Sequence, residues 1–202
     1  MAEASIHSNT SGVFKGFYKD SKTRIGKFGG NNEDALNRIL GNISLPFPLF
    51  SNYECEYEIH RGDSNVIVGS VENVDLAYID PPYNQHPYGS NYFMLNLIID
   101  YIEPQNVSKV SGIPNNWNRS YYNKRAYAYN SFKELIEKIN AKVLLISFNS
   151  EGFITHDEMI GLLKEVGKTE ILETKYNTFK GSRNLKNREI YVKEYLYLVE
   201  KE

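Results

Sequence analysis

The sequence lacks the features that mark secreted, membrane-spanning or strongly basic proteins. A single cysteine, Cys55, has no partner for an intrachain disulfide, and no charged start leads into an apolar run. This argues against secretion and favours a reducing, cytoplasmic setting. The richest apolar window, Tyr92 to Ile99, is interrupted by Asn96 and falls far short of the roughly 20 residues that cross a bilayer. The formal net charge is only -2, so any contact with a nucleic acid must be local.

What the chain does contain is typical of one globular domain. Its 202 residues are 41% hydrophobic and 24% charged, which is enough to bury one core, and we expect residues 1–202 to form a single unit. Aromatic residues make up 13%, with 16 tyrosines against one tryptophan, which suits either stacking surfaces or an ordinary core. Neither His60 nor His86 has neighbours at metal-ligand spacing, so we expect no metal site.

The apolar periodicity predicts an α/β fold. Alternating or continuous apolar runs predict five strands, namely Tyr53–Ile59, Val74–Ile79, Val143–Phe148, Thr169–Tyr176 and Ile190–Val199. Helical spacing recurs in three segments between them, namely Tyr92–Ile102, Phe132–Ile139 and Asp157–Val166. Such alternation indicates a mostly parallel sheet covered by helices, and two final strands with no helix between them indicate an antiparallel hairpin at the edge. Ligands of such sheets bind beyond the carboxyl ends of the strands, here after Ile59, Ile79 and Phe148.

The string Asp80-Pro81-Pro82-Tyr83 follows one of these strands and suits chemistry on an aromatic amino group. Such a nitrogen is a poor nucleophile because its lone pair is delocalised into the ring. Acceptors on Asp80 and on the Pro81 carbonyl could hold both amino hydrogens as positive charge develops. The prolines stiffen the turn and remove backbone donors, and the Tyr83 ring could stack on a base taken out of a helix. The alternative is an ordinary strand-ending turn, since these residue types are common in turns.

The context of this string resembles a known family. Asp80 to Tyr83 resembles motif IV of the amino-methyltransferases, and the longer segments Tyr78 to His86 and Tyr88 to Tyr92 resemble the D12 class of DNA adenine-N6 methyltransferases. An aspartate at the first position of the motif is similar to the DNA adenine subfamilies, rather than to those acting on glutamine, ribosomal RNA or cytosine. Thr10 to Phe14 and Ser147 to Gly152 extend the resemblance along nearly the whole chain.

The resemblance implies the carboxyl-terminal half of a Rossmann-like fold that uses S-adenosylmethionine as methyl donor. In this family an aromatic-Gly-x-Gly turn after the first strand binds the donor, and no such turn is present. Phe28-Gly29-Gly30 has similar letters but follows no strand. Asp63 resembles the family's acidic residue near the donor's adenine, with Ser64 and Asp80 as further contacts. The alternative for Asp63 and Ser64 is a helix N-cap.

Contacts with double-stranded DNA carrying a flipped adenine are expected from Asn84 and from a basic loop after Tyr176. The cations of that loop are Lys180, Arg183, Lys186 and Arg188, although a charge run is also typical of a solvated surface. A second candidate is the aromatic and basic stretch Trp117 to Tyr129, for which a tyrosine-rich packing loop is the alternative.

Two functions remain in competition at this point. The first is an adenine-specific DNA methyltransferase of a restriction-modification system, present as a fragment or split subunit that needs an N-terminal half or second subunit and is inactive as the isolated chain. The second is a non-catalytic remnant that binds DNA or a partner. A change of substrate to RNA is a third option, which Asp80 argues against.

Overall fold

The computed structural model describes residues 18–19, 22–24, 26–27, 47–109, 112–177 and 191–201. Two compact units emerge, the first from Met1–Glu56 and Pro87–Arg119, the second from Tyr57–His86 and Ser120–Glu202. The segments 10–14 and 28–30 and the basic loop 180–188 lie outside the described residues.

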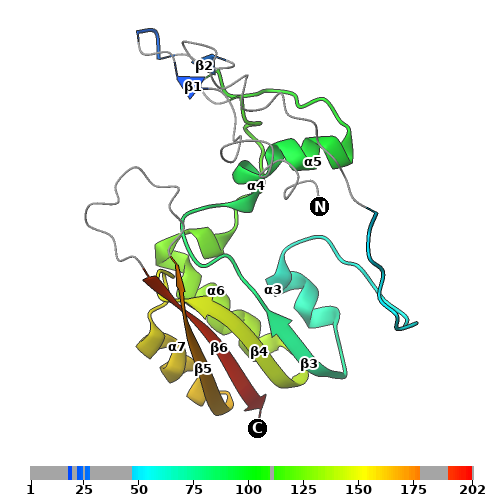
Figure 1. Ribbon diagram of the computed structural model, residues 1–202, viewed down its shortest axis with the longest axis vertical. Coiled ribbons are helices and arrows are strands. Elements are labelled where there is room, and N and C mark those ends of the chain that lie inside the picture. Colours follow the sequence, from blue (N-terminus) through cyan, green and yellow to red (C-terminus); the bar gives the residue numbers. More distant parts are fainter. Residues whose placement is uncertain are drawn as a thin grey trace. The chain divides into compact units, whose positions relative to one another are not determined.

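The second unit is built on a four-stranded sheet (Figure 1). Its strands are β3 (Val74–Ile79), β4 (Ala141–Asn149), β5 (Gly167–Asn177) and β6 (Tyr191–Lys201). In the order β3-β4-β6-β5, β4 is parallel to β3, and β6 is antiparallel to both β4 and β5. The predicted antiparallel pairing of the last two strands is confirmed. Strands β3, β4 and β5 share one direction, but the sheet is mixed because the antiparallel β6 is inserted between β4 and β5. Of the last two strands, β5 lies at an edge of the described sheet and β6 lies inside it.

Helices of the second unit cover one face of this sheet (Figure 1). They are α6 (Arg125–Lys138), preceded by the 3-10 turn η2 (Tyr121–Asn123), and α7 (His156–Lys164). The side chains that are under 2% exposed come from α6, β4, α7 and β6: Phe132, Ile136, Leu144, Ile146, Met159, Leu162, Leu163, Tyr197 and Val199. Burying each such side chain contributes roughly 1.5–3 kcal/mol to folding. Leu76 and Tyr78 of β3, which point to the other face, are 53% and 61% exposed.

Local signals explain where the helices begin and end. A capping box starts α7, because the Thr155 hydroxyl accepts from the Glu158 backbone and the Glu158 carboxylate accepts from the Thr155 backbone. The predicted Asp157–Val166 helix is thus confirmed with slightly shifted ends. The predicted Phe132–Ile139 helix is longer than expected, since α6 begins at Arg125. The first turn of α6 is largely exposed, so its residues do not show the apolar spacing by which a buried helix is predicted.

The first unit contains α4 (Tyr88–Asn91) and α5 (Phe93–Asp100) and a short antiparallel pair, β1 (Tyr18–Lys19) with β2 (Gly26–Lys27). The helix predicted from Tyr92 to Ile102 corresponds to α5, which ends where Tyr101 adopts a left-handed conformation with φ of 49°. Gly89 allows a close approach, since a Cβ there would lie 2.4 Å from the Asn118 carbonyl oxygen. No helix among the described residues is both long and apolar enough to cross a membrane.

The predicted strand from Tyr53 to Ile59 is wrong. Residues 53–61 adopt no regular structure, and Tyr53 and Ile59 are both 85% exposed. Period-two alternation favours a strand only where another strand supplies backbone partners and a core covers the apolar face. No described strand pairs with this segment. The first regular element after it is the short helix α3 (Ser64–Ile67), followed by the 3-10 turn η1 (Val68–Ser70).

Candidate functional site

The Asp80 to Tyr83 turn begins where β3 ends, at the carboxyl edge of the sheet. Ile79, the last strand residue, is 7% exposed and packs in the core, whereas Asp80 is exposed. Pro81 is buried again, and Tyr83 is half-buried. The turn therefore anchors its proline in the protein and presents its carboxylate to solvent.

Hydrogen bonds from two other elements hold this turn in place. The Phe153 N–H donates to the Tyr83 carbonyl oxygen at 2.8 Å. The Asn123 side chain donates from Nδ2 to the Asn84 carbonyl oxygen at 2.7 Å, and the Asn84 Oδ1 accepts from the His86 N–H at 3.0 Å. The loop after β4 and the turn η2 thus fix the backbone at Tyr83 and Asn84. Such support is what a preorganised site requires.

The loop after β4 lies beside the turn, as expected of neighbouring parallel strands. The Tyr83 ring packs edge-on against Phe148, with centroids 6.0 Å apart and ring planes at 68°. Gly152 makes room for this loop, since a Cβ there would lie 2.2 Å from Cε1 of Phe148. Asn149 is 5% exposed, and its Oδ1 accepts from the Glu151 N–H at 3.0 Å. The segment Ser147 to Gly152 thus borders the Asp80 turn.

Glu194 of β6 is a residue that the sequence analysis missed. It pairs in register with Asn149. Burial raises the pKa of its carboxyl group, a hydrogen bond with Asn149 opposes this, and the negative charges of Asp80 and Glu151 raise the pKa further. The carboxyl edge of the sheet therefore carries two acidic side chains from different strands, Asp80 from the end of β3 and Glu194 from β6. Glu194 lies on the same face of β6 as Leu196 and Leu198, and an acid in this apolar row was the available signal.

Asp63 and Ser64 lie at the start of α3. Asp63 is the N-cap residue, and its Oδ1 accepts from the Asn65 N–H at 2.9 Å. Asp63 therefore caps α3, which is the alternative role that the sequence allowed for it. The cap uses one carboxylate oxygen, and both Asp63 and Ser64 are exposed.

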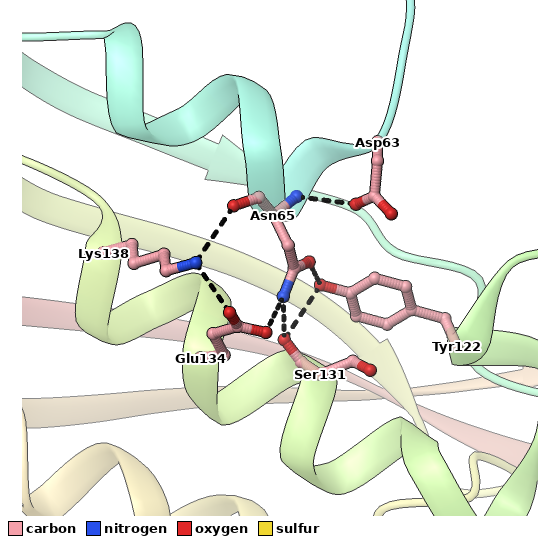
Figure 2. A network of polar contacts seen from close by, with 6 residues as sticks. All are labelled: Asp63, Asn65, Tyr122, Ser131, Glu134 and Lys138. Carbon is pink, nitrogen blue, oxygen red and sulfur yellow. Dashed lines mark hydrogen bonds and ion pairs between the residues drawn. The ribbon is translucent and has the colours of Figure 1, made fainter.

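A polar network docks α3 on α6 (Figure 2). The Asn65 side chain donates from Nδ2 to the Ser131 carbonyl oxygen at 2.8 Å and to the Glu134 carboxylate at 3.0 Å. Its Oδ1 accepts from the Tyr122 hydroxyl at 2.7 Å. The Lys138 ammonium group donates to Glu134 at 2.6 Å and to the Asn65 carbonyl oxygen at 3.4 Å. Asn65 is thus the hub that fixes the helix whose cap is Asp63.

Tyr122 is the buried member of this network. It is 7% exposed, and burial raises its pKa to about 12, with a hydrogen bond from Ser64 opposing the shift and the charges of Asp63 and Glu134 adding to it. The hydroxyl therefore stays neutral and donates its hydrogen. Because Asn65 and Tyr122 are 57 residues apart, no local pattern in the sequence could have revealed their contact.

The remaining predicted residues divide into two groups. Asn84 is half-buried next to Tyr83, whereas the basic residues Lys180, Arg183, Lys186 and Arg188 lie outside the described residues. Among the residues that the structure does describe, no three histidine, cysteine or acidic side chains are grouped so as to hold a metal ion.

Comparison with known proteins identifies relatives. The type II methyltransferase M.CviAII of Paramecium bursaria Chlorella virus 1 is 34% identical over 126 residues, 62% of this chain. The type II methyltransferase M.FokI of Planomicrobium okeanokoites is 30% identical over 180 residues, 88% of this chain, and M.NlaIII of Neisseria lactamica is 27% identical over 198 residues, 96% of this chain. These alignments span 37%, 27% and 54% of the relatives' own lengths. No solved structure matches the chain.

The family model of the D12 class N6 adenine-specific DNA methyltransferases matches residues 9–160. This stretch includes the Asp80 turn, the Asp63 cap and the loop after β4. The family comprises DNA adenine methyltransferases of restriction-modification systems, and it uses S-adenosylmethionine as donor. The match and the relatives together show that the chain belongs to the D12 class of N6 adenine-specific DNA methyltransferases.

Proposed function

We propose that this chain supplies the adenine-binding part of a DNA adenine-N6 methyltransferase and works together with a polypeptide that supplies the rest of the donor site. The observation that carries the proposal is the Asp80 to Tyr83 turn, with an exposed carboxylate, a buried proline and hydrogen bonds to its backbone from Phe153 and Asn123. These features match the needs of a site that must hold one amino group while charge develops on it.

The chain's own residues would act on the adenine. The Asp80 carboxylate and the Pro81 carbonyl oxygen would accept the two amino hydrogens and so favour a more tetrahedral, more nucleophilic nitrogen. Tyr83 would stack on the flipped base and replace part of the stacking lost from the duplex. Its edge-on contact with Phe148 restricts the ring before the base arrives. Asn84, next in the chain, is a DNA contact in this proposal.

S-adenosylmethionine, when bound, would supply the methyl group. Asp63 and Ser64 fit its adenosine part, because one oxygen of the Asp63 carboxylate caps α3 and the exposed side chain retains its other oxygen for an amino donor. Asp80 would border the same donor. A glycine turn outside these 202 residues would cradle the methionine part.

The shape of the sheet supports this division of the fold. We propose that residues 1–202 form the carboxyl-terminal half of a Rossmann-like domain. Among the described strands, β3 pairs only with β4, and its Leu76 and Tyr78 are largely exposed. A further strand beside β3 and helices over the open face would complete the domain. The chain also spans only 27% to 54% of the lengths of the relatives described above.

The test is methyl transfer from labelled S-adenosylmethionine to double-stranded DNA. The chain is assayed alone and after mixing with the portion of a relative such as M.NlaIII that lies outside the matched stretch. We expect transfer to adenine only in the mixture, and none when Asp80 is replaced by alanine. Transfer by the chain alone would contradict the division of the donor site. An inactive mixture that still assembles and binds DNA would favour the non-catalytic remnant.

A further inference from the structure

Two exposed cations and two exposed tyrosines gather where η2 meets α6. The Lys124 ammonium group lies 4.7 Å from the ring centroid of Tyr121 and 5.6 Å from that of Tyr127. The two rings are 5.3 Å apart and are 52% and 53% exposed. Arg125 follows directly and is exposed as well. We call Tyr121, Lys124, Arg125 and Tyr127 the η2 rim.

The rim is attached to the candidate active site on both sides. Asn123, next to Lys124, donates its side-chain hydrogen bond to the Asn84 carbonyl oxygen. The Arg125 guanidinium lies 4.8 Å from the ring centroid of Phe153, whose N–H donates to the Tyr83 carbonyl oxygen. Each cation is therefore one residue or one ring away from a group that holds the Asp80 to Tyr83 turn.

The alternative interpretation of Trp117 to Tyr129, a tyrosine-rich packing loop, holds for Tyr122 and not for the two tyrosines of the rim. Tyr122 is 7% exposed and belongs to the core and to the α3 network. Tyr121 and Tyr127 take no such part, since about half of each side chain is exposed. Exposed rings beneath a lysine hold its ammonium group in place while leaving its hydrogen-bond donors directed outward.

The rim's cations are also available to an anion. Within the part of the chain that the structure describes, neither Lys124 nor Arg125 forms a salt bridge with a carboxylate. Glu158, which feels the charge of Arg125, is occupied by Thr155 in the capping box of α7. In a protein of net charge -2, a local positive cluster of this kind is what an approach to a polyanion requires.

We propose that the η2 rim binds the phosphate backbone of double-stranded DNA beside the target adenine. Lys124 and Arg125 contact phosphates, and Tyr121 and Tyr127 fix the position of Lys124. The position of the target relative to the rim rests on the function proposed above for Asp80 and Tyr83. The Arg119 guanidinium lies 4.2 Å from the centroid of the Trp117 ring. These two residues belong to the first unit and are not part of the rim.

The experiment measures binding of the full 202-residue chain to a fluorescent DNA duplex over a salt series. Each phosphate contact contributes about 0.9 to the slope of log K against log salt. We therefore expect Lys124→Gln and Arg125→Gln each to lower the slope by up to about 0.9, and Lys124→Arg to retain it. The matched control is Lys164→Gln, which makes the same change of charge on an exposed lysine. Lys164 is the last residue of α7 and lies three residues before β5, the strand at the other edge of the sheet from β3. This control should leave the slope unchanged.

Three results would overturn the proposal. The first is a wild-type chain that does not bind duplex DNA, and the second is a set of rim variants that keep the wild-type slope. The third is a control variant whose slope falls as much as that of the rim variants. Thermal unfolding of each variant checks that it is folded, and Lys124→Arg keeps the test valid if a glutamine variant unfolds. Methyl transfer reports separately on the proposed function. A reduced slope without transfer supports the rim alone, whereas transfer with an unchanged slope supports catalysis and rejects the rim.

Discussion

At the residue scale, the role proposed for Asp80 predicts a side chain that matters for methyl transfer and not for folding. It is exposed and lies just beyond a buried strand end. We expect Asp80→Ala to change the free energy of unfolding by no more than about 0.5 kcal/mol. Methyl transfer by the assembled enzyme should fall by about 100-fold or more, because an acceptor that acts on developing charge is lost. The matched control is Asp75→Ala, an exposed aspartate near the start of the same strand, which should retain activity. Near-normal turnover of Asp80→Ala would contradict the role given to it.

The Tyr83 ring should matter more than its hydroxyl. Stacking of a base on an aromatic ring is worth roughly 1–3 kcal/mol. We therefore expect Tyr83→Phe to stay within a few-fold of wild type, and Tyr83→Ala to weaken capture of a flipped base by about 10-fold or more. The fluorescence of 2-aminopurine at the target position reports on flipping. Equal losses in the two variants would show that the hydroxyl, or the fold, carries the effect, and thermal unfolding separates those two cases.

Glu194 gives a prediction for pH. Burial and the charges of Asp80 and Glu151 raise its pKa in the folded state above the ordinary 4.5. A group with a raised folded pKa contributes stability that is complete below pH 4.5 and is lost as the pH rises through the folded pKa. Glu194→Gln should therefore be more stable than wild type at pH 7, and the difference should shrink toward pH 4.5. Urea unfolding at the two pH values measures it.

For Glu158 we expect a change in stability of the opposite sign in the same urea unfolding experiment. Hydrogen bonds from the Thr155 backbone and hydroxyl lower its pKa below 4.5. Its charge therefore stabilises the protein above pH 4.5, and that contribution is lost as the pH falls through the folded pKa. Glu158→Gln should be less stable than wild type at pH 7, with a difference that disappears in acid. If Glu194→Gln is also less stable than wild type at pH 7, the account given for Glu194 is wrong, and if Glu158→Gln is more stable, the account given for Glu158 is wrong.

At the scale of elements, the docking of α3 on α6 depends on a few polar groups (Figure 2). Tyr122→Phe removes the bond to Asn65 Oδ1, and Asn65→Ala leaves the Tyr122 hydroxyl and the Ser131 carbonyl oxygen with fewer partners. We expect each variant to lose about 1–2 kcal/mol in urea unfolding. The double variant should lose less than the sum, because the two residues share one network. Ser70→Ala, which removes an exposed bond to the Ile67 carbonyl oxygen nearby, is the control with little expected effect.

The same elements show what the sequence could and could not predict. Strands β3, β4 and β6 and helix α7 were predictable because each carries regularly spaced apolar residues that pack in the core. Strand β5 and helix α5 were predictable from the same kind of spacing, although Ile99 and Leu172 are 75% and 69% exposed. The Tyr53–Ile59 strand failed because its alternating pattern has neither a paired strand nor a covering core among the described residues. The Asp80 turn was predictable from four adjacent letters. Asn65 and Tyr122 were not, since their partners lie on other elements and are brought close only by the fold. For Glu194 the sequence offered one signal, an acid within an apolar row, but not its nearness to Asp80.

At the scale of the whole molecule, the last prediction concerns the donor. These 202 residues alone should bind S-adenosylmethionine with millimolar affinity or weaker and show no turnover. Affinity for such a ligand needs several convergent contacts in a preformed cleft. The described residues offer Asp63, Ser64 and Asp80, all of them exposed. One exposed carboxylate hydrogen bond contributes only about 1.5–3 kcal/mol, whereas micromolar binding requires about 8 kcal/mol.

Calorimetric titration of the purified chain with S-adenosylmethionine tests this, with and without the unmatched portion of a relative supplied in trans. The exposed Leu76 and Tyr78 beside the outer edge of β3 favour assembly with such a portion. We therefore expect tight donor binding to appear only in the mixture, together with a larger particle in size-exclusion chromatography. Asp63→Ala should weaken that restored binding, and Asp75→Ala should not. Micromolar binding by the isolated chain would mean that the donor site lies within these 202 residues, so that the turn cradling the methionine part would have to be sought in this sequence.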